Sequence, residues 1–269
     1  MPDRYCSTPD VLVADVADGS SIAVAPDYSG VAIAATRALI RKQARRLHLI
    51  AVPQSGLQAD LLIGAGCVGI MECAGVNLGE FGLAPRFTDW VQQGRLTMRD
   101  ATCPAIHAGL QAAEKGVPFI PLRGILGSDL LNERPDWRVI DNPYQHDDPI
   151  VLIPAIKPDV ALFHAALADR AGNVWVGIRR ELMLMAHAAR RTLVTVEAIH
   201  DGDLLTDPTL AAGTIPAFYV SRICLEPGGM RPLGFSPAGE QADAPMIEAY
   251  VAAARTQAGF DAHLAEWLA

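Results

Sequence analysis

The sequence predicts an α/β fold in which helices cover an open, mainly parallel sheet. Short apolar segments typical of strands alternate with longer segments that have helical periodicity. Several apolar segments are continuous, as expected of strands covered on both faces. The chain has 269 residues, of which 51% are hydrophobic and 19% charged. That composition is globular, and we expect one compact unit over residues 1–269.

In the amino-terminal part of the chain, the predicted elements follow one another in the order strand, loop, helix. A strand is predicted at Ser21–Ala25, followed by a loop at Pro26–Gly30 and a helix from about Val31 to Arg46. The next strand is predicted at Leu47–Val52. The apolar segment Asp60–Gly66 is interpreted as a strand that ends in two glycines, where the backbone passes close to another strand or a ligand.

The rest of the chain continues the alternation. Helices are predicted at Thr102–Lys115 and Arg180–Arg191. The segment Leu131–Asp148 is irregular and long for a loop, so we expect it to lie over a pocket or a partner. The further apolar runs that we interpret as strands are Val68–Met71, Val117–Ile120, Val151–Ile153, Val160–His164, Val174–Val176 and Leu193–Val196.

Charge and cysteine content exclude several classes of protein. The net charge is -8 and the basic residues are scattered, so a nucleic-acid partner is not expected. No signal peptide and no apolar run of about 18 residues is found, so neither secretion nor a membrane span is expected. The five cysteines lack paired spacing and fit a reduced, cytoplasmic protein. The histidines do not cluster with acids at ligand spacing, so no metal site is predicted.

The segment Leu122–Leu130 is the first candidate site. It follows an apolar run that we interpret as a strand, and ligands collect at the carboxyl ends of strands in open α/β sheets. Arg123, Ser128 and Asp129 supply a cation, a hydroxyl and a carboxylate, and Gly127 permits close backbone approach. An ordinary turn capped by the aspartate would explain the same residues.

Four glutamates are embedded in apolar segments, at positions Glu72, Glu181, Glu197 and Glu226. A buried acid must be paired, or its pKa must rise. We therefore interpret Glu197, which ends an apolar run, as either a site residue or a member of a buried ion pair.

A series of motifs resembles the alpha subunit of family I coenzyme A transferases, of the glutaconate CoA-transferase type. The resemblance implies the open α/β fold shared by CoA transferases and sugar-phosphate isomerases. It also implies that Asp169, Gly172 and Asn173 hold a tight turn between two strands. The motifs, in family order, are Asp60–Gly66, Gly79–Phe87, Gly116–Arg123, Gly127–Leu130, Pro154–Val160, Ala168–Asn173, Val194–Glu197 and Glu226–Gly229.

The resemblance further implies a working unit of α and β subunits, often two of each. A glutamate of the β subunit would attack an acyl-CoA, forming a glutamyl anhydride and then a glutamyl-CoA thioester. The coenzyme A thioester is then a substrate, and no permanently bound cofactor is expected. Since this chain has the length of one subunit, its own glutamates are not assigned the nucleophile role.

Two positions depart from the family pattern. Relatives carry a Gly-Gly loop after the first strand, where this chain has Ala25–Tyr28, so a ligand contact there is in question. Relatives have Glu, an aromatic residue and Ser where this chain has Asp100, Ala101 and Thr102. Some related hydrolases use an α-chain acid nearby, which makes Asp100 the candidate catalytic residue of this chain and Thr102 a candidate pocket residue. An alignment shifted by a few residues places Cys103 at this position instead.

Three functions follow in order of preference. The first is an α subunit that moves CoA between an acyl-CoA and a carboxylic acid. The second is one chain of a hydrolase acting on a CoA thioester or a cyclic β-keto acyl-CoA, with water replacing the acceptor acid. The third is a homo-oligomer that binds acyl-CoA without catalysis.

Overall fold

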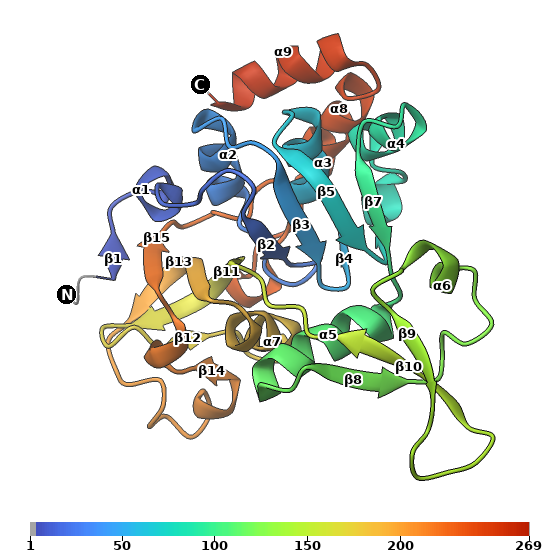
Figure 1. Ribbon diagram of the computed structural model, residues 1–269. Helices are drawn as coiled ribbons and strands as arrows, with labels where there is room; N and C mark the ends of the chain where they lie inside the picture. Colours follow the sequence, from blue (N-terminus) through green and yellow to red (C-terminus); the bar gives the residue numbers. More distant parts are fainter. Residues whose placement is uncertain (1–3, 269) are drawn as a thin grey trace.

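The computed structural model describes residues 4–268 and is built around a twisted, mainly parallel sheet (Figure 1). All neighbours along its main path pair in parallel. The strand order is β1 (Tyr5–Cys6), β15 (Arg222–Leu225), β13 (Arg191–His200), β11 (Val160–Asp169), β2 (Ser21–Val24), β3 (Leu47–Ala51), β5 (Val68–Cys73) and β7 (Thr97–Asp100). Two short antiparallel strands, β12 (Val174–Trp175) and β14 (Thr214–Ile215), extend β11. The predicted open, mainly parallel α/β sheet is confirmed.

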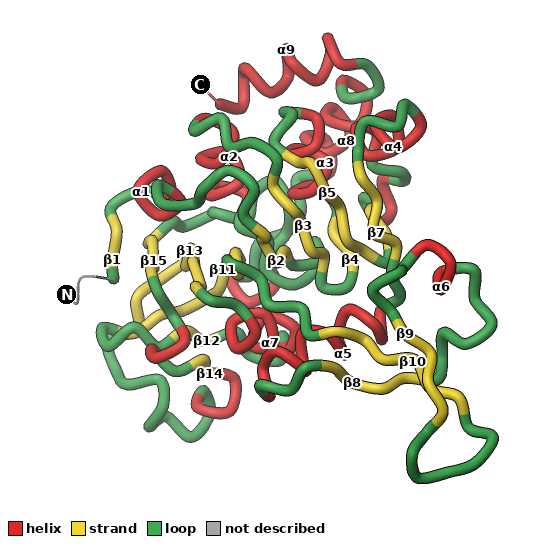
Figure 2. The backbone as a smooth tube through the Cα atoms, in the orientation of Figure 1, coloured by secondary structure: helices red, strands yellow, loops and turns green. Residues whose placement is uncertain are grey.

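Apart from the short helix α6 (Leu130–Glu133), the helices form two groups, which Figure 2 shows in the upper and lower parts of the view. The first group contains α1 (Pro9–Val13), α2 (Ile33–Arg41), α3 (Leu57–Gly64) and α4 (Pro85–Gln92), with α8 (Ala244–Ala253) and α9 (Gln257–Leu268). The second contains α5 (Cys103–Lys115) and α7 (Arg180–Ala188), which pack on each other. Helices on both faces explain why the strands between them are continuously apolar.

The prediction of a strand at Asp60–Gly66 is wrong, because these residues belong to α3 and its C-terminal turn. Every residue of α3 is buried, including the polar Gln58 and Asp60, so its sequence has no exposed polar face and lacks helical periodicity. Gly64 is needed for close packing, since a Cβ atom there would lie 2.6 Å from the ring of Phe260. The two glycines therefore allow close helix packing and helix termination, and they do not mark the end of a strand.

A second sheet projects from the first at the lower right of Figure 1. It is antiparallel, with the order β8 (Phe119–Leu122), β10 (Pro149–Pro154) and β9 (Arg138–Asp141). The expectation that the runs at 117–120 and 151–153 lie in the covered parallel sheet is wrong. Every residue of β9 is exposed, and so is Phe119 of β8. The segment 131–148 contains the rest of α6 (Leu130–Glu133) and β9.

The turn after β11 is held as the sequence predicts. Asp169 Oδ1 accepts hydrogen bonds from the backbone N–H groups of Ala171, Gly172 and Asn173 at 2.9–3.0 Å. Its Oδ2 accepts from Asn173 Nδ2 at 2.7 Å and from Leu204 N–H at 3.0 Å. Gly172 has φ +95°, a left-handed conformation that favours glycine. One buried carboxylate thus fixes the turn and the chain that crosses it.

Short elements complete the described chain. They are β4 (Gln54–Ser55), which pairs with β6 (Gly75–Val76), and the 3₁₀ turns η1 (Gly79–Phe81), η2 (Ala211–Gly213), η3 (Ala217–Tyr219) and η4 (Ser236–Ala238).

A buried polar contact attaches the C-terminal helices to the first group. Tyr250 of α8 donates a hydrogen bond to Asp60 Oδ2 of α3 at 2.6 Å, and both side chains are fully buried. Phe87 N–H donates to the other carboxylate oxygen at 2.6 Å. Burial raises the pKa of Asp60 to about 6, while these hydrogen bonds oppose the rise.

Candidate functional site

The order of strands reverses beside β2, which makes this part of the sheet the first place to look for a ligand. From β2 the chain builds β3, β5 and β7 on one side, and then crosses to β11, β13 and β15 on the other. In open α/β sheets, ligands bind in the crevice at the carboxyl ends of strands at such a switch point. The residues that follow β2 are therefore placed at the expected binding edge.

Asp27 is a buried carboxylic acid at this edge. Leu57 N–H, in the first turn of α3, donates a hydrogen bond to Asp27 Oδ2 at 3.0 Å. The other oxygen, Oδ1, is buried and has no hydrogen-bond partner among the described residues. Burial raises the pKa of this carboxyl group to about 7, although the hydrogen bond from Leu57 opposes the rise. Gly56 allows the approach, because a Cβ atom there would overlap Asp27 Oδ2.

A cavity of about 280 Å³ lies against Asp27. Its walls come from the loop after β2, from α3, from the η1 turn and from the segment that leads into α8. Most of its lining is apolar, and Asp27 and Glu80 are the only carboxylic acids among the described residues that line it. The lining residues are Asp27, Tyr28, Leu57, Leu78, Gly79, Glu80, Phe81, Leu233, Gly234, Ala242 and Ile247.

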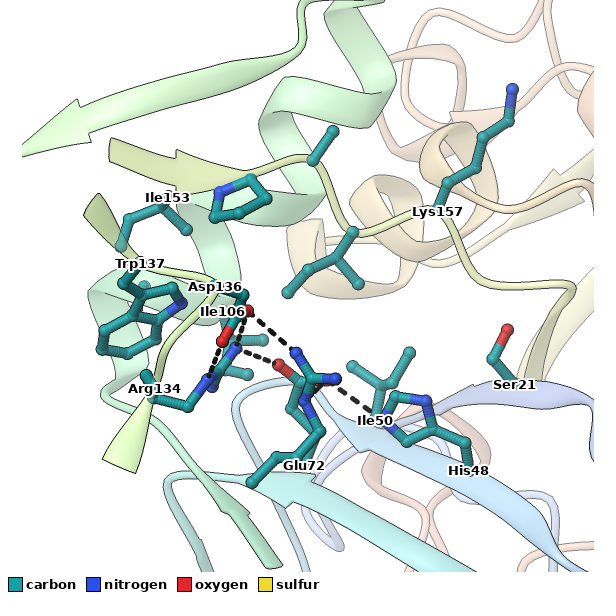
Figure 3. Close-up of a pocket in the computed structure, with 15 residues that line it drawn as sticks. Ser21, His48, Ile50, Glu72, Ile106, Arg134, Asp136, Trp137, Ile153 and Lys157 are labelled. Atoms are coloured by element: carbon teal, nitrogen blue, oxygen red, sulfur yellow. Dashed lines mark hydrogen bonds and ion pairs between the residues drawn. The ribbon is translucent and has the colours of Figure 1, made fainter. Parts of the chain in front are cut away.

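A second hollow, of about 210 Å³, is charged and lies between the main sheet and the small sheet (Figure 3). Glu72 of β5 is its central group and is only 4% exposed. Its carboxylate lies 2.8 Å from Arg134 Nη2, 3.0 Å from His48 Nε2 and 3.4 Å from Arg99 Nε. Asp136 also contacts both arginines, at 2.9 Å and 2.8 Å.

The acidic and basic side chains of this charged cleft are paired with one another. Burial alone would raise the pKa of Glu72, but the hydrogen bond from His48 and the charges of Arg134 and Arg99 hold it below its ordinary value. Arg134 also donates to the backbone carbonyl of Asp100 at 3.0 Å. The network thus joins the segment before β9 to β5 and β7, and the expected position of 131–148 beside a pocket is confirmed.

Ser21 and Lys157 also line the cleft, and Figure 3 shows the Lys157 side chain extending away from the Glu72 network. Arg99 is 38% exposed, so its guanidinium is accessible to an anionic group. Ser21 and His48 lie at the beginnings of β2 and β3, whereas Glu72 and Arg99 lie one residue before the ends of β5 and β7. Because Glu72 and Asp136 are both paired with the two arginines, the cleft suits a structural role or an anion contact better than it suits the reacting centre.

The sequence-predicted site residues lie in two neighbouring places. Asp100 ends β7, and Thr102 caps α5 by accepting a hydrogen bond from Ala105 N–H at 3.3 Å. The other four follow β8, and the premise that they lie at the carboxyl edge of the parallel sheet is wrong, because β8 belongs to the antiparallel sheet. Those four are Arg123, Gly127, Ser128 and Asp129.

These four residues form an open loop. Arg123 is 61% exposed and pairs with Asp148, with Nε donating at 2.7 Å. Ser128 Oγ accepts from Leu130 N–H at 3.3 Å, whereas Asp129 makes no capping bond to α6. Arg123 lines a separate hollow of about 650 Å³ on the small sheet, together with Phe119 and Tyr144. None of the six predicted residues lines the cavity beside Asp27 or the charged cleft.

Glu197 proves to be part of a buried pair. Its Oε1 lies 2.6 Å from His164 Nε2, and its Oε2 accepts from Gly228 N–H at 2.8 Å. His164 is fully buried and also contacts Thr195 Oγ1 at 2.8 Å through Nδ1. Burial would raise the pKa of Glu197, but the contact with His164 and the bond from Gly228 lower it overall. Of the two interpretations, the structure favours the ion pair.

Comparison with known proteins identifies the family. The model of the family described as coenzyme A transferase matches residues 6–225. The chain belongs to the coenzyme A transferase family. It is 33% identical to the A subunit of glutaconate CoA-transferase from Acidaminococcus fermentans, over 78% of this chain and 70% of that protein. It is 32% identical to the A subunit of 3-oxoadipate CoA-transferase from Pseudomonas knackmussii, over 94% of this chain and 89% of that protein.

Solved structures and a further relative agree with membership of the coenzyme A transferase family. The crystal structure of glutaconate CoA-transferase from Acidaminococcus fermentans superposes with a TM-score of 0.86 and 28% identity, covering 99% of this chain and 89% of that chain. The decarboxylase AibA/AibB gives 0.84 and 29%, covering 98% and 97%. The cholesterol ring-cleaving hydrolase IpdA subunit of Mycobacterium tuberculosis is 28% identical over 97% of this chain and 91% of that protein.

Family membership fixes the class of substrate, since coenzyme A transferases act on coenzyme A thioesters. Within residues 4–268, no group of three or more His, Cys, Asp or Glu side chains is placed to hold a metal ion. No helix of that same span is long and apolar enough to cross a membrane. Sequence reasoning did not single out Asp27 as a candidate site residue, although the loss of the family's Gly-Gly loop at this position was a visible sign of change.

Proposed function

We propose that this chain is the α subunit of a CoA transferase that moves CoA between an acyl-CoA and a carboxylic acid. The observation that supports this most is the similarity to two relatives that are each named as the A subunit of a CoA transferase. The enzyme would contain two α and two β subunits and no permanently bound cofactor. Its free cysteines suit a reducing compartment such as the cytoplasm.

The nucleophile would be a glutamate of the β subunit. Three of the four embedded glutamates of this chain are already engaged: Glu72 in its ion network, Glu197 with His164, and Glu181 with the hydroxyl of Ser29. A glutamate held in this way is a poor nucleophile, because its charge and lone pairs are committed to other groups.

The reaction would split one exchange into easier steps. The β-subunit carboxylate attacks the thioester carbonyl, forming an acyl-glutamyl anhydride and expelling the CoA thiolate. The thiolate then attacks the glutamyl carbonyl of the anhydride, which releases the first carboxylic acid and leaves a glutamyl-CoA thioester. The acceptor carboxylate runs the same steps in reverse and leaves as the new acyl-CoA.

We assign to Arg123 a contact with the anionic part of CoA, supported by its exposure and by the loop of Gly127, Ser128 and Asp129 beside it. Its pair with Asp148 is at the surface and contributes little to stability. Arg123→Ala is expected to lower kcat/KM by about tenfold or more, a loss of one charge-assisted contact, with the midpoint of urea denaturation unchanged. Wild-type turnover in this variant would show that Arg123 is not part of the site. Thr102 and Asp100 remain proposed pocket and acid residues.

Hydrolysis of a CoA thioester or of a cyclic β-keto acyl-CoA is the second candidate. The similarity to the ring-cleaving hydrolase subunit over 97% of this chain favours it. In that case Asp100, exposed at the end of β7, would be the acid of this chain that assists water.

The test is to co-express the chain with a candidate β chain and to assay acyl-CoA with and without short carboxylic acids. Transfer of CoA to an acid only when both chains are present supports the transferase. Release of free CoA without an acid supports the hydrolase. A stable homo-oligomer of the single chain, with no turnover by the pair, would support the non-catalytic binding protein.

A further inference from the structure

The cavity beside Asp27 has no part in the transfer steps described above, and its chemistry points to a particular occupant. We propose that this cavity binds the acyl group of the CoA substrate, that the acyl group is apolar and lacks a second carboxylate, and that Asp27 is its polar anchor. This inference rests on the proposed function, because it takes the ligand to be an acyl-CoA.

The size and lining of the cavity support an apolar acyl group. At about 280 Å³ it has room for about nine groups the size of a water molecule. Leu57, Leu78, Leu233 and Ile247 give it walls that are themselves at most 8% exposed. Well-packed apolar walls of this kind favour an alkyl chain over water.

The charges at the cavity argue against a dicarboxylic acyl group. Asp27 and Glu80 are both acids, and none of the described lining residues is Lys, Arg or His. The free carboxylate of a glutaconyl or 3-oxoadipyl group would be buried here without a cation, which is costly. This chain therefore differs in acyl specificity from the relatives whose names carry those dicarboxylates.

The geometry of Asp27 makes it the anchor. Its Oδ2 is fixed by Leu57 N–H, so the carboxyl group cannot turn away, and its buried Oδ1 has no partner within the described part of the chain. If Asp27 served only to cap α3, it would use only Oδ2. Asp27 lines the cavity, and both burial and the neighbouring charge of Asp60 raise its pKa, to about 7. The protonated form is therefore available near neutral pH and can donate a hydrogen bond to an acyl oxygen.

The first experiment measures acyl specificity in two ways. Calorimetry on the assembled enzyme, or on this chain alone if no β chain binds, gives dissociation constants for hexanoyl-CoA, decanoyl-CoA, glutaryl-CoA and free CoA. The same acyl-CoAs are then assayed for transfer to acetate. We expect glutaryl-CoA to bind at least about tenfold more weakly than hexanoyl-CoA, whose acyl group has similar length.

Matched leucine variants test the location. Leu233→Ala enlarges the cavity and should raise the preference for decanoyl-CoA over hexanoyl-CoA by about tenfold. Leu96→Ala removes a similarly buried leucine outside the cavity and should leave that preference unchanged. Equal binding of glutaryl-CoA and hexanoyl-CoA, or the same chain-length profile in both variants, would overturn the proposal.

The pH dependence of binding tests the anchor. Affinity for hexanoyl-CoA relative to free CoA should fall about tenfold per pH unit above pH 7 in the wild type, and Asp27→Asn should abolish that dependence. A pH profile that is identical in both proteins would remove Asp27 from the site. Selective acyl-CoA binding without any CoA transfer would refute the proposed function but support the acyl pocket. CoA transfer without acyl selectivity would support the proposed function but refute the acyl pocket.

Discussion

The ion network around Glu72 gives the sharpest prediction about stability. Glu72 and Arg134 are each 4% exposed, and the carboxylate also contacts His48 and Arg99. Glu72→Gln keeps the shape of the side chain but removes its charge, so that the buried guanidinium retains only Asp136 as an acidic partner among the described residues. Removing one partner of a buried pair costs about 3–5 kcal/mol. Because Asp136 remains, we expect a loss of about 3 kcal/mol in the free energy of unfolding.

Urea denaturation measures this loss, and Trp137 provides a local probe because Arg134 lies 4.3 Å from its ring centroid. The matched control is Asp10→Asn, which breaks a surface pair with Arg41 and should cost less than about 1 kcal/mol. Equal losses in the two variants would refute the assignment of the buried network as a main stabilising contact of the small sheet.

The sign of the pH effect follows from the pKa of Glu72. That pKa is lower in the folded protein than in the unfolded chain, so its contribution is complete above the ordinary glutamate pKa and is lost as the pH falls. The stability difference between wild type and Glu72→Gln should therefore shrink below about pH 4.5. A difference that stayed constant or grew at acidic pH would contradict the charge-based explanation.

Two further substitutions test close contacts. Gly56→Ala would drive a Cβ atom into Asp27 Oδ2, so it should cost about 1–3 kcal/mol and weaken acyl-CoA binding, whereas Gly124→Ala, which meets nothing within 4 Å, should be neutral in thermal melts and calorimetry. Tyr250→Phe leaves one oxygen of the buried Asp60 carboxyl group without its donor and should cost about 1–3 kcal/mol by urea denaturation, while Tyr144→Phe at a 96% exposed position should cost nothing measurable. Equal effects within either pair would contradict these contacts.

Much of the fold could be predicted from the sequence because local patterns and tertiary structure agree over most of the chain. The strands at Ser21, Leu47 and Val160 and the helix from Cys103 carry clear apolar patterns and capping residues. The α3 helix could not be separated from a strand, because burial on all sides removes the polar face that reveals helical periodicity.

The site was harder to predict than the fold. The strand β8 has the apolar composition of a sheet strand, but its own sequence does not indicate which sheet it joins. The sequence therefore predicted, wrongly, that Arg123 to Asp129 lie at the carboxyl edge of the parallel sheet. Asp27 becomes a candidate only when α3, η1 and the chain before α8 enclose it, because a lone aspartate in a loop is ordinarily exposed. Its environment comes from residues far along the sequence, such as Leu233.

The position of the nucleophile can be read from the intact mass of each chain after the two-chain enzyme is mixed with acyl-CoA and no acceptor acid. An α subunit whose partner supplies the nucleophile predicts a CoA adduct on the β chain, none on this chain, and loss of the adduct when a carboxylic acid is added. A CoA adduct on this chain would show instead that one of its own carboxylates is the nucleophile, contrary to the role proposed for it.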